Sequence, residues 1–163
     1  MGVADLLSPQ RIELNLPLRD KQAVLERLVE LEGRGDAIID LEAFRQDMMA
    51  REAQGGTAVE AGIAVPHAKS SAVRYPSLAV VTLQEGIDCG ALDGVPSDIF
   101  FMIAVPADAE KIEKYIETKV DGNLKKLHED RMLRELMSYD TLRINGVEYK
   151  NLPALNWMFD HDR

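Results

Sequence analysis

The sequence predicts an α/β fold (α+β in the finer division), with a mixed β-sheet sandwiched by helices. Residues Ile12–Leu16 alternate between apolar and polar, as a half-buried strand does. Residues 20–32 then take helical spacing, and Ile99–Val105 is continuously apolar, as in a central strand covered on both faces. Since 163 residues suit one domain and are few for two, we expect a single domain over 1–163.

Two helices are expected in the N-terminal part of the chain. Over 20–32 the apolar residues fall on one stripe, and Gly33 and Gly35 end the pattern. The second helix takes Asp40 as its N-cap, because an aspartate there accepts a backbone hydrogen bond from the first turn. It is expected to end around residues 51–53, just before a glycine-rich turn.

Three strands and a hairpin are expected further along. Apolar runs predict strands over Val59–Val65, Leu78–Leu83 and Ile99–Val105, with a turn at 92–96 before the last of them. Helical spacing returns from Asp108 to about 120 and again over about 124–137. An Asn-Gly pair between alternating apolar positions predicts a β-hairpin over 142–149.

Composition narrows the class of protein. The chain has 28 acidic against 19 basic residues, a net charge of −9, which argues against nucleic-acid binding and suits a basic protein partner. No apolar run reaches the roughly 20 residues that span a bilayer. The single cysteine, Cys89, cannot form an internal disulfide. We therefore expect a cytoplasmic protein.

His67 is the leading candidate for chemistry. It directly follows a short apolar run and Pro66, which offers no N–H to a strand ladder. We expect the strand to end at His67 and the imidazole to point out of the end of the sheet. Near pH 7 an imidazole is both uncharged and nucleophilic, so it can accept a group and pass it on. A structural or merely exposed histidine is the alternative left open.

Three further side chains are candidates for binding an anion at His67. Arg51 closes the helix whose following loop leads into the strand of His67, and a guanidinium binds oxyanions with two parallel hydrogen bonds. Lys69 adds positive charge two residues away, and Thr57 can donate its hydroxyl hydrogen to the same anion. A solvated helix-end arginine and a threonine that only shapes the turn are the alternatives.

The sequence predicts no metal site and no cofactor. His67, His128 and His161 lie far apart, and there is one cysteine. No glycine-rich phosphate loop precedes a helix. His128 and His161 are expected to be surface residues.

Four stretches appear together in a specific order: an Arg-Glu pair with its Gly-Thr turn (51–57), a Gly-x-Ala-x-Pro-His segment (62–69), an Asp-Gly turn (92–96) and an apolar strand ending in Val-Pro (101–106). Together they resemble enzyme IIA of the fructose/mannitol class (type 2), a component of the bacterial phosphoenolpyruvate-dependent sugar phosphotransferase system. The resemblance covers about residues 6–108 and is weak over 110–163. It implies the same sandwich of helices and mixed sheet.

The resemblance implies a phosphotransferase that works as a phosphocarrier. His67 would accept a phosphoryl group from the histidine-containing phosphocarrier protein and pass it to a IIB component during uptake of a fructose- or mannitol-like sugar. Arg51 would stabilise the phosphate, with no cofactor or metal. The resemblance leaves association with a membrane IIC component open, without direct insertion into the membrane.

The chain departs from the family at one functional position. Family members carry a second histidine at the start of the helix after the Val-Pro strand end, where this chain has Lys111 or Glu113. The next histidine is His128. Two other interpretations therefore stay open: a regulatory module of the nitrogen-related type that acts by protein binding, and a degenerate homologue with impaired transfer.

Overall fold

The computed structural model describes residues 6–108, 141–144 and 147–150. The chain divides into two compact units, one of residues 7–107 and one formed by 1–6 together with 108–163. The expected single domain over 1–163 stays a prediction. All the predicted site residues belong to the unit of residues 7–107.

Both predicted helices form where their capping residues place them. Asp20 caps α1 (Lys21–Glu32), with its carboxylate accepting from the N–H of Ala23 at 3.1 Å. Asp40 caps α2 (Leu41–Gln54) in the same way, accepting from Ala43 at 3.1 Å. Helix α2 runs slightly beyond its expected end. Within the ranges that the structure describes, no helix is long and apolar enough to cross a membrane.

The sheet of this unit is mixed, as predicted. Strand β4 is antiparallel to β5, whereas β1 is parallel to β4, and β2 and β3 are both parallel to β5. The order is β1-β4-β5, with β2 and β3 following one another along the outer edge of β5. The strands are β1 (Ile12–Leu16), β2 (Ile63–Ala64), β3 (His67–Ser70), β4 (Ser77–Ile87) and β5 (Ser97–Pro106).

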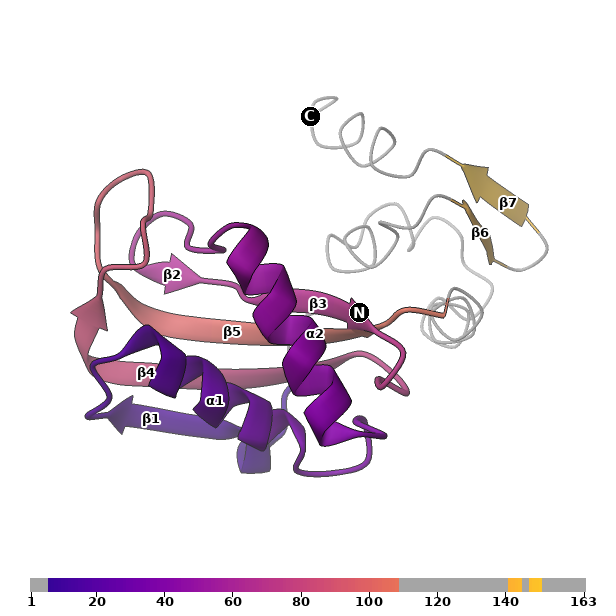
Figure 1. The fold of residues 1–163 in the computed structure, drawn as a ribbon, viewed down its shortest axis with the longest axis horizontal. Coiled ribbons are helices and arrows are strands. Elements are labelled where there is room, and N and C mark those ends of the chain that lie inside the picture. Colours follow the sequence, from indigo (N-terminus) through magenta and orange to yellow (C-terminus); the bar gives the residue numbers. More distant parts are fainter. Residues whose placement is uncertain (1–5, 109–140, 145–146, 151–163) are drawn as a thin grey trace. The chain divides into compact units, whose positions relative to one another are not determined.

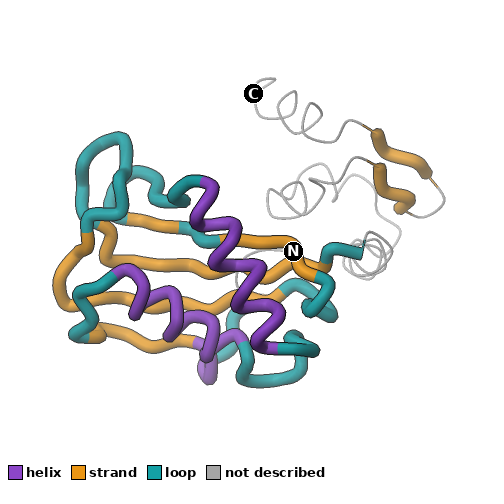
Figure 2. The backbone as a smooth tube through the Cα atoms, in the orientation of Figure 1, coloured by secondary structure: helices purple, strands orange, loops and turns teal. Residues whose placement is uncertain are grey.

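The core lies between the sheet and the two helices, which cover the same face of it (Figures 1 and 2). Burial of these apolar side chains is the main force that holds the helices on the sheet. Along β5 every second residue is fully buried on this face. The strands contribute Ala79, Val81, Leu83, Phe100, Met102 and Ala104, and the helices contribute Val24, Leu25, Leu28, Val29, Leu31, Phe44 and Met48.

The predicted strand over Val59–Val65 is wrong in extent. Only β2 pairs with β5 there, and an isolated bridge joins Ala58 to Ala64. Ala61 and Gly62 both have positive φ, 61° and 79°, and this left-handed pair folds the chain back on itself. The predicted strand becomes a tight loop followed by a two-residue strand.

The expected strand end at His67 is also wrong, because His67 begins β3 instead. Pro66 interrupts the edge strand without ending it. The N–H of Ile103 donates to the Pro66 carbonyl at 2.9 Å, and pairing with β5 resumes at once with His67 opposite Ile103.

The second unit contains the predicted hairpin. Strand β6 (Thr141–Ile144) is antiparallel to β7 (Val147–Lys150), with Ile144 paired to Val147. The helices predicted over 108–120 and 124–137 lie outside the described residues.

One buried acid lies at the end of α1. Glu32 is fully buried, and the Ser77 hydroxyl donates to its Oε1 at 2.9 Å. Burial raises the pKa of Glu32 to about 8, against 4.5 when exposed, and the Ser77 hydrogen bond only partly opposes this shift. Between these two values the folded protein binds a proton that the unfolded chain has released, so stability falls as pH rises from about 4.5 to about 8.

Replacing Glu32 with glutamine should therefore flatten this part of the pH dependence and stabilise the protein at pH 8. The difference in unfolding free energy between Glu32→Gln and wild type should grow by up to about 1.4 kcal/mol per pH unit through this range. Denaturant unfolding at pH 5, 6.5 and 8 measures it. Glu30→Gln, at an exposed position of the same helix, is the control and should leave the pH dependence nearly unchanged. Equal slopes for Glu32→Gln and wild type would contradict the assignment.

Candidate functional site

His67 is exposed at the start of an edge strand. Along β3, Ala68 and Ser70 are buried, whereas His67 and Lys69 are exposed. Because side chains alternate along a strand, His67 and Lys69 lie on one face and Ala68 and Ser70 on the other. The Ser70 hydroxyl donates to Asp47 of α2 at 2.5 Å, which places the buried pair on the helix side. His67 and Lys69 thus lie on the opposite face.

The imidazole of His67 is oriented by the backbone two residues earlier. Its Nδ1 lies 2.8 Å from the carbonyl oxygen of Val65. A carbonyl oxygen only accepts hydrogen bonds, so the neutral ring carries its proton on Nδ1. The lone pair is then on Nε2, the ring nitrogen farther from the backbone. This tautomer has a nucleophilic nitrogen on an exposed side chain.

The Val65 carbonyl is available because Val65 faces away from β5, whereas the carbonyl of the next residue, Pro66, accepts from Ile103 of β5. Val65 is held on its other side, where its N–H donates to the carbonyl of Thr57 at 3.0 Å. Just beyond, the N–H of Val59 donates to Ile63 at 2.8 Å. A short antiparallel ladder of residues 57–59 against 63–65 therefore supports the carbonyl that orients His67.

Thr57 connects this ladder to the end of α2. Its hydroxyl donates to Oε1 of Glu52 in a very short hydrogen bond. The other oxygen of Glu52 lies 3.1 Å from the ammonium of Lys21, at the start of α1. The Glu52 side chain is only 5% exposed, so its charge is matched within the protein. In this state the Thr57 hydroxyl is directed to Glu52.

Arg51 lies in the last turn of α2. Its Nη1 donates to the carbonyl of Gly55 at 3.0 Å, which satisfies a free carbonyl beyond the helix end. Among the described residues it makes no hydrogen bond to His67. The side chain is half-buried, and its hydrogen bond to the Gly55 carbonyl is exposed to solvent.

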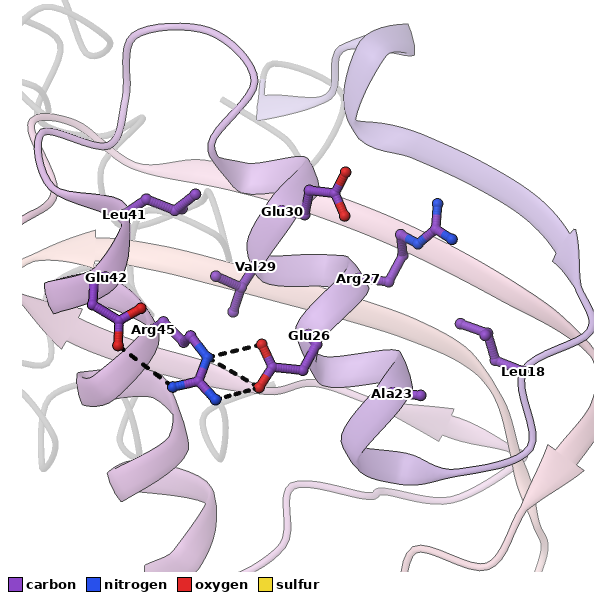
Figure 3. A pocket seen from close by; sticks show the side chains of 9 residues that line it. All are labelled: Leu18, Ala23, Glu26, Arg27, Val29, Glu30, Leu41, Glu42 and Arg45. Carbon is purple, nitrogen blue, oxygen red and sulfur yellow. Dashed lines mark hydrogen bonds and ion pairs between the residues drawn. The ribbon is translucent and has the colours of Figure 1, made fainter.

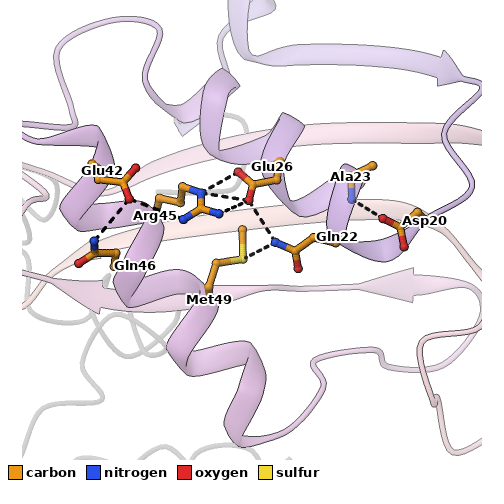
Figure 4. Close-up of polar contacts among 8 residues, drawn as sticks. All are labelled: Asp20, Gln22, Ala23, Glu26, Glu42, Arg45, Gln46 and Met49. Atoms are coloured by element: carbon orange, nitrogen blue, oxygen red, sulfur yellow. Dashed lines mark hydrogen bonds and ion pairs between the residues drawn. The ribbon is translucent and has the colours of Figure 1, made fainter.

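A separate groove of about 650 Å³ lies between α1 and α2 (Figure 3). It contains none of the predicted site residues. In this groove the Arg45 guanidinium donates hydrogen bonds to the Glu26 carboxylate, with nitrogen–oxygen distances of 2.5 to 3.0 Å. It also forms an ion pair with Glu42 at 3.6 Å (Figure 4). Hydrogen bonding to Arg45 keeps the pKa of Glu26 below its usual range. These contacts join the two helices. Arg27, the other arginine that lines the groove, pairs with Glu13 at 3.1 Å.

Sequence reasoning missed Glu52 and Lys21. A glutamate in the last turn of a helix faces the negative end of the helix dipole, which is an unfavourable position. That signal, together with the Arg-Glu pair, was present in the sequence. Its partner Lys21, 31 positions earlier, could not be paired with it from spacing alone.

The chain is similar to two groups of curated proteins. It is 36% identical to a nitrogen regulatory protein of Pseudomonas aeruginosa over 112 residues, covering 69% of this chain and 71% of that protein. It is 34% identical to the fructose-specific EIIA component of Haloferax volcanii over 133 residues, covering 80% and 85%. With the fructose-specific EIIABC component of Bacillus subtilis it shares 29% identity over 142 residues, and it spans only 22% of that protein's length.

Solved structures share the fold. The nitrogen regulatory protein IIA-Ntr of Neisseria meningitidis superposes with a TM-score of 0.61 at 20% identity, covering 96% of this chain and 98% of that one. Enzyme IIA-mannitol of Escherichia coli, in complex with phosphorylated IIB-mannitol, gives a TM-score of 0.56 at 21% identity, covering 69% and 78%. The predicted fold class is thereby confirmed.

Residues 5–131 match the family described as "Phosphoenolpyruvate-dependent sugar phosphotransferase system, EIIA 2". This range contains His67, its supporting loop and the whole of the five-stranded sheet. The chain belongs to the type 2 enzyme IIA family of the sugar phosphotransferase system.

Proposed function

We propose that this chain is a phosphocarrier in which His67 accepts a phosphoryl group from the histidine-containing phosphocarrier protein and passes it to a IIB component. The protein would act in the cytoplasm and would serve the uptake of a fructose- or mannitol-like sugar. One observation carries the proposal: His67 is exposed, and its Nδ1 is engaged by the Val65 carbonyl at 2.8 Å, which leaves Nε2 as the nucleophile.

Transfer would proceed in line at phosphorus. The lone pair of Nε2 forms a bond to phosphorus as the phosphorus–nitrogen bond of the donor's phosphohistidine breaks, and the donor imidazole leaves with that electron pair. The ring of His67 then carries a positive charge. The Val65 carbonyl dipole, facing the Nδ1 proton, stabilises that charge. Transfer to the IIB component is the same step in reverse, with His67 as the leaving group.

Positive charge would complete the site. Lys69 lies on the same face of β3 as His67, about 7 Å away along the strand. Arg51 would reach the phosphoryl group by exchanging its bond to the Gly55 carbonyl for a bidentate contact with phosphate oxygens. Thr57 would support the site through the backbone. The place of the family's second histidine, Lys111 or Glu113, lies outside the described residues.

An acidic and apolar surface next to the site suits a basic protein partner. The loops around Val59 and Leu92 lie side by side, joined by the N–H of Ala61 donating to Asp93 at 2.9 Å. Val59, Leu92 and Val95 are exposed there. A hollow of about 520 Å³ is lined by Ala58, Val59, Glu60, Leu92 and Asp93. Residues 52–68 and 75–108 contain no lysine or arginine. Attraction between opposite charges would steer a basic carrier onto this surface.

A regulatory function is the second candidate. The 36% identity to a nitrogen regulatory protein favours it. In that case His67 would be phosphorylated by the same chemistry, and the phosphorylated and free forms would differ in protein binding. Label on His67 that never moves to any IIB component would support this function over sugar transport.

The His67→Ala variant should take up no phosphoryl group. Incubation with phosphoenolpyruvate, enzyme I and the carrier protein should give an acid-labile phosphate on wild type and on the control His161→Ala, but none on His67→Ala, because the nucleophile is removed. Radiolabel retention after separation at alkaline pH measures this. An unlabelled wild type, or label on His67→Ala, would refute the phosphocarrier proposal.

The Arg51→Ala variant should transfer the phosphoryl group more slowly and remain folded. Loss of a guanidinium that neutralises the transferring group should lower the rate by on the order of 100-fold. The single exposed bond to Gly55 predicts little change in stability. Quenched-flow transfer rates and thermal unfolding test both statements, with exposed Arg74→Ala as the control. Unchanged rates would remove Arg51 from the site.

Leu92→Ser should weaken transfer from the carrier protein without affecting the chemistry of His67. Truncating an exposed apolar contact should lower the second-order rate constant about tenfold. Phosphorylation by the small donor phosphoramidate should be unchanged, since it needs no docking surface. Leu14→Ser is the control, because Leu14 is an exposed leucine on β1, at the opposite edge of the sheet. Equal rates for Leu92→Ser and wild type would place the carrier elsewhere.

A further inference from the structure

The geometry points to Glu52 and Thr57 as positioning residues for His67: anchored by Lys21, they fix the loop whose Val65 carbonyl selects the Nδ1–H tautomer of the imidazole. This inference rests on the proposed function, because the tautomer matters only if Nε2 attacks phosphorus. Neither residue touches the ring, and they act through the backbone.

An unbroken sequence of contacts connects the two helices to the imidazole. The Lys21 ammonium lies 3.1 Å from Oε2 of Glu52, and the Thr57 hydroxyl donates to Oε1 of the same carboxyl. The Thr57 carbonyl accepts from the N–H of Val65 at 3.0 Å. The Val65 carbonyl then faces Nδ1 of His67 at 2.8 Å.

The position of Glu52 is unfavourable for a merely structural residue. Its side chain is only 5% exposed, and it lies in the last turn of α2, where the helix dipole disfavours a negative charge. The burial is offset only because both oxygens have a partner, one cationic and one a hydroxyl. An apolar residue would fill this position more simply. The carboxyl is the group that can hold Lys21 and Thr57 at the same time.

The loop needs this anchor because its own backbone is irregular. Ala61 and Gly62 have positive φ. Thr57 is preceded by Gly55 and Gly56, which have no side chain to pack against the protein. On the other side, β5 pairs with Ile63 and Ala64 and donates to the carbonyls of Gly62 and Pro66. Val65 lies between these points, and the Thr57 carbonyl is the acceptor of its N–H. Thr57 thus fixes the peptide groups around Val65 in a way that β5 does not.

The Thr57→Val variant tests the inference, because it removes the hydroxyl and keeps the shape. An exposed imidazole in water favours the Nε2–H tautomer, so loosening the Val65 carbonyl should shift His67 towards it. Nitrogen-15 NMR of the histidine side chains, assigned with His67→Gln, should show Nδ1–H in wild type and a mixture in Thr57→Val. The rate of phosphorylation by phosphoramidate should fall by on the order of tenfold.

A conservative variant and a matched control separate positioning from general destabilisation. Thr57→Ser keeps the hydroxyl and should retain the wild-type tautomer, whereas Glu52→Ala should behave like Thr57→Val. Thr82→Val is the same chemical change at a hydroxyl that accepts from the Asn15 N–H at 2.7 Å, between β1 and β4. It should leave both the tautomer and the rate unchanged.

The outcomes keep the two proposals apart. A wild-type tautomer and rate in Thr57→Val, or equal losses in Thr82→Val, would overturn the positioning role. If the carrier protein fails to label wild type, the phosphocarrier function fails, and the tautomers of wild type and Thr57→Val still decide the role of Thr57.

Discussion

Pairing of the edge strand with β5 on both sides of Pro66 is the constraint on which the proposed site depends. A continuous edge strand along β5 would engage every second residue's backbone groups in the ladder. Pro66 has no N–H to give, yet its carbonyl accepts from Ile103 at 2.9 Å, so the ladder breaks for one step and resumes. Because alternate residues face β5, the backbone of Val65 faces away from it, and its carbonyl accepts from His67 at 2.8 Å. An edge strand with a single interruption can therefore be rigid and still offer one oriented nucleophile.

The two buried glutamates show how the surroundings of a carboxyl decide its role. Glu32 and Glu52 both lie in the last turn of a helix, and both are withdrawn from solvent. Glu32 accepts a hydrogen bond from the Ser77 hydroxyl, and burial raises its pKa to about 8. Glu52 has the Lys21 ammonium at 3.1 Å as well as a hydroxyl. A neutral acid such as Glu32 can be buried in the core without an ionic partner. The ion-paired Glu52 instead connects α1, α2 and the loop before His67.

The features that sequence reasoning predicted correctly are those that depend on residues close together in the chain. The Asp40 cap, the apolar run of β5 and the Asn-Gly hairpin each depend on neighbours within a few residues, and all were confirmed. His67 was found from its place after Pro66, but its role as the first residue of β3 was not. That role depends on pairing with Ile103, 36 positions later. The left-handed φ of Ala61, stabilised by Asp93, and the contact of Glu52 with Lys21 likewise join distant segments that spacing alone cannot connect.

The chemistry of His67 does not distinguish a sugar component from a nitrogen regulatory one. Either function needs an exposed imidazole with Nε2 free, and the relatives include proteins of both names. What differs is the protein that must recognise the phosphorylated form. The surface that could make this distinction lies beside the site, in the apolar and acidic loops around Val59 and Leu92. Because exposed loops vary without disturbing a core, partner choice can change there while the Pro66 break, the Val65 carbonyl and His67 stay the same. In the proposed function the chemistry would thus be carried by the sheet edge, and specificity would be left to the loops that flank it.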